Sequence, residues 1–438
     1  MSLPPEIAKR LRLPVICSPL FIISNPELTI AQCKAGVVGS FPSLNARPLS
    51  QLDEWLAQIT EELAAWDRAH PDQLSAPFAV NQIVHKTNDR LEKDLELCEK
   101  YKVPMVITSL GAREELNQAV HGWGGTVMHD IINDRFARKA IEKGADGLIA
   151  VASGAGGHAG QLSPFALIQE IRQWFDGPVA LSGSIANGSS VLAAQAMGAD
   201  LAYIGSLFIA SEEANADQAY KQMIVDSKAT EIVYSNLFTG VHGNYLAPSI
   251  VKAGMDPANL PESDPSAMNF GSGGSSKAKA WKDIWGCGQG IGVVDAVRPA
   301  ANIVDQLADE CSRRPSNWSS PGGSKPSMGE ASTCSVAAAA SAMPRPRYAC
   351  RAAHWKPSSS DAKPATLPFT VFSSPASLSR GRPRSSAIKS TIASTWVSVT
   401  GLQAAKMIRC EHSVICGWFI ATGAMRWRSS SGSATNRV

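Results

Sequence analysis

The stretch GLIAVASGAGGHAG, residues 147–160, joins a short apolar run to a break of small residues that holds a single histidine, His158. A continuous apolar run is typical of a strand that is buried on both faces, as in parallel sheets. The sequence therefore predicts a buried strand followed by a glycine-rich loop, and the rest of the chain repeats this pattern.

Eight such runs occur in the first 205 residues, and helical patterns lie between them, as at 49–70, 88–101, 134–144 and 189–199. Eight strand–helix units in about 200 residues predict an α/β fold, a (β/α)8 TIM barrel. A doubly wound open sheet is the alternative, because the number of runs does not exclude it. The runs are 13–17, 36–40, 77–81, 103–107, 125–129, 146–151, 178–182 and 200–205.

The loops after the last two runs carry the clearest local signal. SGSIANG (182–188) follows the seventh run and IGS (204–206) follows the eighth. Gly183 with Ser184, and Gly205 with Ser206, would let backbone N–H groups approach a phosphate at the active face of a barrel. Ordinary βα turns also use glycine and serine, so it is the pair of loops together that favours a phosphate site.

Composition divides the chain into two regions. Residues 315–438 hold 15 Lys and Arg against 3 Asp and Glu, whereas the residues before them have a net charge of −9. The C-terminal region also holds 25 serines and no sustained apolar period, so it cannot bury enough surface to offset chain entropy. We predict a catalytic domain over 1–312 and a basic tail over 313–438 that is disordered or translated out of frame, without a nucleic-acid role.

Global features favour an intracellular protein. The nine cysteines contain no CxxC pair, and no apolar run has the length of a membrane span or the form of a signal peptide. We expect a cytoplasmic protein with no metal site and no membrane association. A homodimer is an expectation that the sequence leaves open.

A long segment, about 210–286, follows the eighth run. Long insertions on the active face of a barrel often form lids and substrate pockets. His242, Asn244 and Tyr245 are therefore candidate pocket residues, with a plain surface loop as the alternative. GQGIG (288–292) is expected to open a last helix over VVDAVRPAANIVDQLADE (293–310).

Several of these stretches together resemble the nitronate monooxygenase family, formerly called 2-nitropropane dioxygenases. VASGAGGHAG (151–160), LSGSIANG (181–188) and MGADLAYIGSLFIAS (197–211) carry most of the resemblance. LPVICSPL (13–20), FAVN (78–81) and GCGQGIG (286–292) match as well, so the resemblance covers roughly residues 10–310 in the same order.

The resemblance implies a TIM barrel that binds FMN and oxidises alkyl nitronates, such as propionate 3-nitronate, with O2. It implies that His158 is catalytic or binds the substrate. The residues expected to contact the cofactor are Ser18, Pro19, Leu20, Asn81, His129, Gly156, Gly157, Gly183, Ser184, Gly205 and Ser206.

The chain also departs from the family pattern. Leu20 stands where the family often has Met, and Ser184 stands where a second Gly is frequent. Ala155 lies near a position that is acidic in many members, and His129 lies near the place of a lysine beside the flavin in some. These differences affect the expected substrate and flavin tuning more than the expected fold.

Nitronate oxidation would explain the histidine and its small neighbours. A nitronate is already deprotonated, so its oxidation requires a cofactor, a group that holds the nitro oxygens, and space for O2. An imidazole can hold the anion or accept a proton, and the glycines around His158 would leave clearance for a flavin and its substrate. An FMN-dependent NAD(P)H:quinone or enoyl-acyl-carrier-protein reductase, with NAD(P)H as donor, and a non-catalytic phosphate-ligand binding protein are the alternatives.

Overall fold

The computed structural model describes residues 3–263, 283–313, 408–410 and 413–415. Eight parallel strands form one sheet in the order β1-β9-β8-β6-β5-β4-β3-β2, and a bridge between Ile16 and Val38 joins its two ends. The prediction of a barrel is thus confirmed and the open doubly wound sheet is wrong. The strands are β1 (Val15–Cys17), β2 (Gly39–Pro42), β3 (Phe78–Ile83), β4 (Met105–Ser109), β5 (Thr126–Ile131), β6 (Gly147–Val151), β8 (Val179–Ser182) and β9 (Leu201–Ile204).

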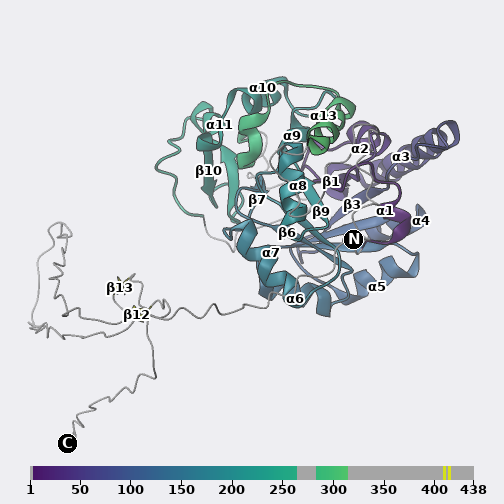
Figure 1. Ribbon diagram of the computed structural model, residues 1–438, viewed down its shortest axis with the longest axis horizontal. Coiled ribbons are helices and arrows are strands. Elements are labelled where there is room, and N and C mark those ends of the chain that lie inside the picture. Colours follow the sequence, from purple (N-terminus) through teal and green to yellow (C-terminus); the bar gives the residue numbers. More distant parts are fainter. Residues whose placement is uncertain (1–2, 264–282, 314–407, 411–412, 416–438) are drawn as a thin grey trace, which may run out of the picture. The chain divides into compact units, whose positions relative to one another are not determined.

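Helices surround this barrel (Figure 1). Several begin at a side-chain cap, since Asn25, Asn133 and Asn187 each accept a hydrogen bond from the backbone N–H of the third residue beyond them. The helices are α2 (Pro26–Lys34), α3 (Leu49–Ala69), α4 (Leu91–Lys100), α5 (Glu114–Gly122), α6 (Asp134–Glu142), α7 (Pro164–Arg172), α8 (Gly188–Ala196), α10 (Gln218–Asp226) and α13 (Ala300–Ser312), with the shorter α1 (Pro5–Ala8), α9 (Ser206–Ile209) and α11 (Ala247–Lys252).

The core has an inner and an outer part, because strand residues alternate between two faces. One cluster fills the barrel interior with residues such as Met105, Ile107 and Met128. The N-terminal segment contributes Ile7 and Leu11 to the same cluster, so it packs against these interior residues. Two further clusters lie between the strands and the helices.

The segment after β9 adds a small antiparallel sheet. Its strands are β10 (Ile232–Ser235), β11 (Gly243–Leu246) and β7 (Gly157–His158), in the order β10-β11-β7. His158 pairs with Gly243, so the insertion hydrogen-bonds directly to the loop after β6.

The last helix differs from its expected extent. Residues 289–293 form a 3-10 turn, η4 (Gln289–Val293), and α13 begins at Ala300 rather than at residue 293. Pro299 explains the difference, because a proline starts a helix well but disfavours helical backbone in the residue before it.

The C-terminal region forms a second unit, from which the structure describes two short antiparallel strands, β12 (Ile408–Cys410) and β13 (Ser413–Ile415). The predicted disorder of the tail otherwise concerns residues outside the described ones. Among the described residues, no helix combines the length and apolar character needed to cross a membrane.

Candidate active site

A cavity of about 720 Å³ opens at the carboxyl ends of the barrel strands. Its walls come from the loops after these strands and from the insertion after β9. The cavity brings together twelve residues that the sequence singled out, namely Ser18, Pro19, Leu20, Asn81, His129, Gly156, Gly157, His158, Gly183, Ser184, Gly205 and Ser206.

The floor of the cavity is polar and is built by side chains that point into the barrel. Met128 belongs to the interior cluster, so by strand alternation Asp130, two residues further along β5, faces the same way. The same step leads from Ile107 to Ser109 on β4. The layer formed in this way contains Ser18, Asn81, Ser109, Asp130, Val151, Ser182 and Tyr203, all of which line the cavity.

Asn81 is oriented by its neighbours on β4. Its side-chain nitrogen Nδ2 donates to the carbonyl oxygen of Ile107 at 3.0 Å and to Oγ of Ser109 at 2.8 Å. Both Nδ2 protons are therefore used, which leaves the Oδ1 oxygen as the group that Asn81 can offer to a ligand as an acceptor.

His129 lies one residue away from this inward layer. Val127 and Ile131, its neighbours on the same face of β5, belong to the cluster between strands and helices. The His129 Nδ1 atom is 2.5 Å from Oγ1 of Thr108, and burial lowers the pKa of His129 to about 4. The imidazole is thus neutral at pH 7 and bonded to the β4 hydroxyl, and the charged inward side chain of β5 is Asp130.

Asp130 is the acidic residue of the cavity that the sequence analysis missed. Burial raises its pKa to about 6, although the hydroxyl of Ser109 and the backbone N–H of Leu110 both donate to it. Leu110 has a φ of +62°, and this strained backbone presents its N–H to the carboxylate. The period of two from Met128 would have identified Asp130, but the predicted fifth strand ends at His129.

The two predicted phosphate loops leave backbone groups for a ligand. Within the described chain, the N–H groups of Gly183 and Gly205 donate to no protein acceptor. Gly183 and Ser184 both have positive φ angles, +133° and +58°. The Ser184 N–H donates to the carbonyl oxygen of Gly154 at 3.3 Å, so the Gly183 N–H is the backbone donor that this turn leaves for an anion.

A third glycine-rich segment lies against these loops. The backbone N–H of Gly288 donates to Oγ of Ser206 at 2.8 Å, and a Cβ on Gly290 would lie 3.0 Å from the carbonyl carbon of Ser184. The GCGQGIG stretch therefore supports both phosphate loops from the insertion side.

The glycines near His158 serve mainly to pack protein against protein. A Cβ on Gly154 would lie 2.2 Å from Oγ of Ser184, and one on Gly156 would lie 2.8 Å from the backbone nitrogen of Gly288. Gly157, with a φ of +63°, is the member of the stretch whose added Cβ would meet no atom within 4 Å. The expected clearance for a ligand is thus wrong at Gly154 and Gly156, where the protein's own atoms occupy the space.

His158 is held by the insertion. Its Nε2 lies 3.2 Å from Oγ1 of Thr239, and that hydroxyl donates its proton to the carbonyl oxygen of Val241 at 2.8 Å. This arrangement favours the tautomer in which Nε2 carries the imidazole proton and donates it to Thr239. Burial lowers the pKa of His158 to about 4, so the ring is neutral at pH 7 and Nδ1 is the basic nitrogen.

The three residues proposed from the insertion do not line the cavity. His242 stacks on Tyr234 with ring centroids 5.0 Å apart, and Asn244 donates through Nδ2 to the carbonyl oxygen of Ala155 at 2.6 Å. Tyr245 is fully buried against Phe238. The side chains of the insertion that line the cavity are instead Tyr220, Phe238, Thr239, Val241 and Trp285.

The described residues contain no group of three or more His, Cys, Asp and Glu side chains placed to hold a metal ion. At the two glycine and serine loops the cavity offers backbone N–H groups and serine hydroxyls as donors. Such a donor set suits a phosphorylated organic cofactor better than a metal.

Comparisons with known proteins agree on one protein family. The family model described as nitronate monooxygenase matches residues 7–310. The chain is similar to the nitronate monooxygenase of Paraburkholderia phytofirmans, with 26% identity over 68% of this chain and 92% of that protein. It is also similar to the nitronate monooxygenase of Neurospora crassa, with 24% identity over 68% of this chain and 89% of that one.

Solved structures share the fold. A nitroalkane oxidase from Streptomyces ansochromogenes has a TM-score of 0.58, with 22% identity over 69% of this chain and 96% of that chain. FabK from Thermotoga maritima has a TM-score of 0.54, with 21% identity over 69% of this chain and 94% of that chain.

Proposed function

The chain belongs to the nitronate monooxygenase family of flavin-dependent oxidoreductases, and we propose that it binds FMN in the cavity and oxidises alkyl nitronates, such as propionate 3-nitronate, with O2. The observation that carries the cofactor assignment is the pair of glycine and serine loops after β8 and β9. Their glycine N–H groups have no protein acceptor in the described chain, and they adjoin a cavity with a polar floor.

The residues present fit FMN. The N–H groups of Gly183 and Gly205, with the hydroxyls of Ser184 and Ser206, would hold the phosphate without a cation. Asn81 offers its Oδ1 as an acceptor for an N–H group of the flavin ring. When bound, the flavin would take electrons from the nitronate and pass them to O2.

His158 is suited to a substrate that arrives already deprotonated. A general base works best when its pKa lies near the working pH, and the pKa of His158 is about 4. The imidazole is therefore a poor base for removing a carbon-bound proton from a neutral nitroalkane. A nitronate anion beside it would instead favour a proton on Nδ1, and the resulting imidazolium would hold the nitro oxygens.

Thr239 fixes the orientation of this imidazole. In the tautomer that this contact favours, the hydroxyl accepts from Nε2, so the proton that enters on substrate binding would enter at Nδ1. Thr239 is a positioning residue, since it acts on the substrate through His158.

A test separates this function from the alternatives. Purified protein should be yellow or should become so when FMN is added. Anaerobic mixing with propionate 3-nitronate should reduce the flavin rapidly, whereas NAD(P)H should not. A protein that cannot be loaded with FMN would overturn the proposal, and flavin reduction by NAD(P)H alone would indicate a reductase.

A further inference from the structure

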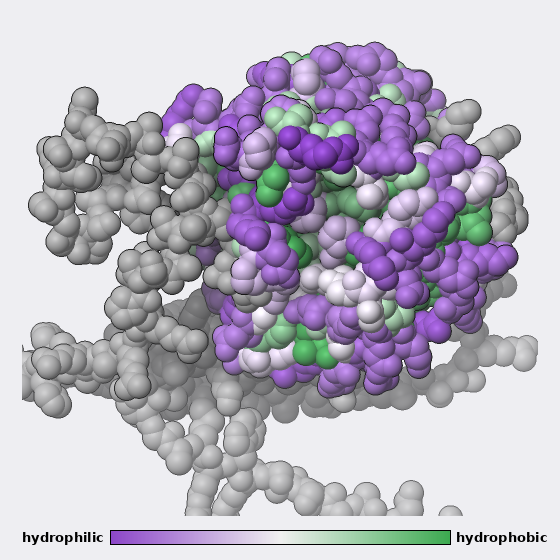
Figure 2. Space-filling model, turned by 90° about the vertical axis from the view of Figure 1, so that its right-hand side faces the viewer, coloured by the Kyte–Doolittle hydropathy of each residue, from purple (hydrophilic) through white to green (hydrophobic). Residues whose placement is uncertain are grey.

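Among the described residues that line the cavity, Asp130 is the single acid. Most of the molecular face drawn in Figure 2 is hydrophilic, because charged side chains normally remain in water. Asp130 lies instead inside the barrel, two residues beyond Met128 of the interior cluster. A carboxyl group in such a place is expected to have either a structural partner or a function.

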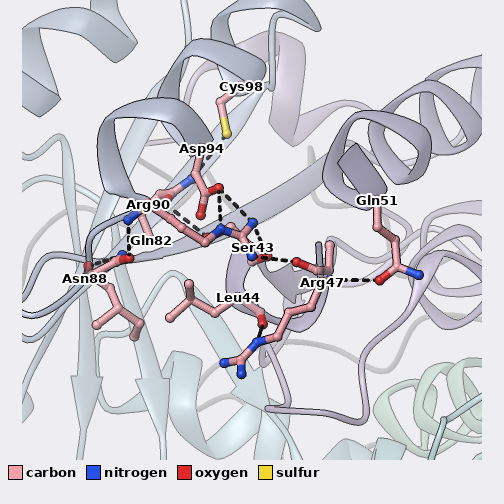
Figure 3. Close-up of polar contacts among 11 residues, drawn as sticks. Ser43, Leu44, Arg47, Gln51, Gln82, Asn88, Arg90, Asp94 and Cys98 are labelled. Carbon is pink, nitrogen blue, oxygen red and sulfur yellow. Dashed lines mark hydrogen bonds and ion pairs between the residues drawn. The ribbon is translucent and has the colours of Figure 1, made fainter. Parts of the chain in front are cut away.

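Another buried carboxyl group of the chain shows what a structural partner looks like. Burial raises the pKa of Asp94, whose Oδ1 lies 2.8 Å from the guanidinium of Arg90. Arg90 also donates to the carbonyl oxygen of Ala46 at 2.7 Å. Figure 3 shows the Arg90 side chain bonded to Asp94, so a cation balances this charge. Asp94 lies outside the cavity lining, and its role is to hold the loop after β2.

Asp130 has no such cation. It forms no ion pair with any other described residue, and its donors are the hydroxyl of Ser109 and the backbone N–H of Leu110. The Oγ of Ser109 accepts in turn from Asn81 at 2.8 Å. These neutral donors fix the position of the carboxyl group but do not balance its negative charge. A proton is therefore the counterion that this site can take up.

The position of Asp130 places it beneath the expected flavin. The phosphate loops follow β8 and β9, whereas Asn81 lies on β3, on the opposite side of the closed barrel. A ligand that reaches from these loops to Asn81 must cross the floor of the cavity. Burial and the charge of Asp130 raise the pKa of the Tyr203 hydroxyl on β9, so the side chains of Asp130 and Tyr203 both reach toward the barrel axis.

The other titratable groups around Asp130 do not change charge near pH 7. The adjacent strands, β4 and β6, contribute the hydroxyl of Ser109 and the apolar Val151. Burial lowers the pKa of both histidines of the lining to about 4 and raises the pKa of both tyrosines, so all four are neutral. These four are His129, His158, Tyr203 and Tyr220. The cations of the lining are Arg47, which follows β2, and Lys139 on α6.

We propose that Asp130 binds a proton when the flavin above it is reduced, and thereby neutralises the charge that reduction places in the cavity. The inference rests on the proposed binding of FMN and adds a proton-binding residue to it. Two electrons and one proton convert the neutral flavin ring to a reduced anion, and a second proton, from solvent, binds the Asp130 carboxylate. Asp130 releases this proton when the electrons leave the ring.

The direction of the effect follows from charge. The pKa of Asp130 is about 6 in the protein without cofactor, so most of the carboxyl group is ionised between about pH 7 and pH 8. A negative charge on the ring above it disfavours a second negative charge and raises this pKa. Reduction between the two pKa values therefore binds one proton more than the ring itself takes up.

The first test counts protons from the pH dependence of the midpoint potential of the FMN-loaded enzyme between about pH 7 and pH 8. We expect Asp130→Asn to bind about one proton fewer per two electrons than the original protein. One proton is a tenfold change in the equilibrium constant per pH unit, or about 30 mV for a two-electron couple. The control is Asp176→Asn, because Asp176 is exposed and lies outside the cavity lining. Equal proton counts in Asp130→Asn and the original protein would overturn the proposal.

Ser109→Ala distinguishes an electrostatic role from a structural one. The Ser109 hydroxyl favours the ionised carboxylate, so its loss should move the pH range of the additional proton uptake upward. The same substitution added to Asp130→Asn should leave the proton count of that variant unchanged. A range that stays in place in Ser109→Ala would contradict the assignment of this proton to Asp130.

Infrared difference spectra of the chemically reduced and oxidised FMN-loaded enzyme locate the proton directly. At pH 8 we expect reduction to produce a band of a protonated carboxyl group that is present in Asp176→Asn and absent from Asp130→Asn. Neither measurement requires nitronate turnover, because dithionite supplies the electrons. Failure to bind FMN would refute the proposed function, whereas bound FMN that is reduced without this band would refute the role of Asp130 alone.

Discussion

Asp130→Asn should change the pH dependence of stability in a defined direction. Burial raises the pKa of Asp130 from 3.8 to about 6, so the folded protein binds a proton that the unfolded chain has released between these values. Stability is therefore lost as pH rises through this window. At about 1.4 kcal/mol per pKa unit, the ionised carboxylate costs about 3 kcal/mol at pH 8 and about 0.5 kcal/mol at pH 4.

Asparagine removes this charge and keeps an oxygen for the Ser109 hydroxyl and the Leu110 N–H. The free energy of unfolding of Asp130→Asn, relative to the original protein, should thus increase by about 2.5 kcal/mol between pH 4 and pH 8. The assay is urea unfolding of the FMN-free protein at several pH values, with Asp176→Asn as an exposed control. A difference between variant and original protein that stays constant with pH would refute the reasoning.

Three further outcomes follow from the site. His158→Gln should lower nitronate turnover by about 10²-fold or more with FMN still bound, whereas His121→Gln on α5 should not, and equal turnover in both variants would exclude His158 from the chemistry. Gly156→Ala should destabilise the apoprotein in urea more than Gly122→Ala, because a Cβ on Gly156 would lie 2.8 Å from the Gly288 nitrogen whereas one on Gly122 would meet nothing within 4 Å, and the reverse order would contradict the packing assigned to Gly156. A chain ending at Arg313 should keep its unfolding midpoint and activity, and loss of soluble protein would show that the tail belongs to the folded domain.

The barrel could be predicted from the sequence because its evidence is periodic and redundant. Eight buried strands each produce a continuous apolar run, and an error in one boundary does not change the number of units. The small residues at 183–184 and 205–206 could be located because parallel strands all end at the same face of the barrel.

Side-chain direction could not be inferred as safely. The predicted fifth strand ends at His129, two residues before β5 ends at Ile131, so the prediction stopped short of Asp130 on the inward face. The predicted His129 lines the cavity and bonds to Thr108, whereas Asp130, which faces the floor, could be found only by extending the strand. Alternation along the strand from Met128 predicts that Asp130 faces the barrel interior. An aspartate at a buried strand position is uncommon, so residue type alone does not suggest it.

The pocket residues of the insertion were mispredicted for a different reason, because pairing with distant parts of the chain decides which of its side chains reach the cavity. Thr239 orients His158 across 81 residues of sequence, and β11 pairs with β7 to bring the two together. No local pattern indicates a threonine in such a role, whereas His242 and Tyr245 attract attention by residue type. The orientation of His158 in the loop after β6 thus depends on the fold of the insertion. A substitution in β11 that breaks its pairing with Gly157 should therefore lower the turnover that depends on His158, even though β11 lies outside the cavity lining.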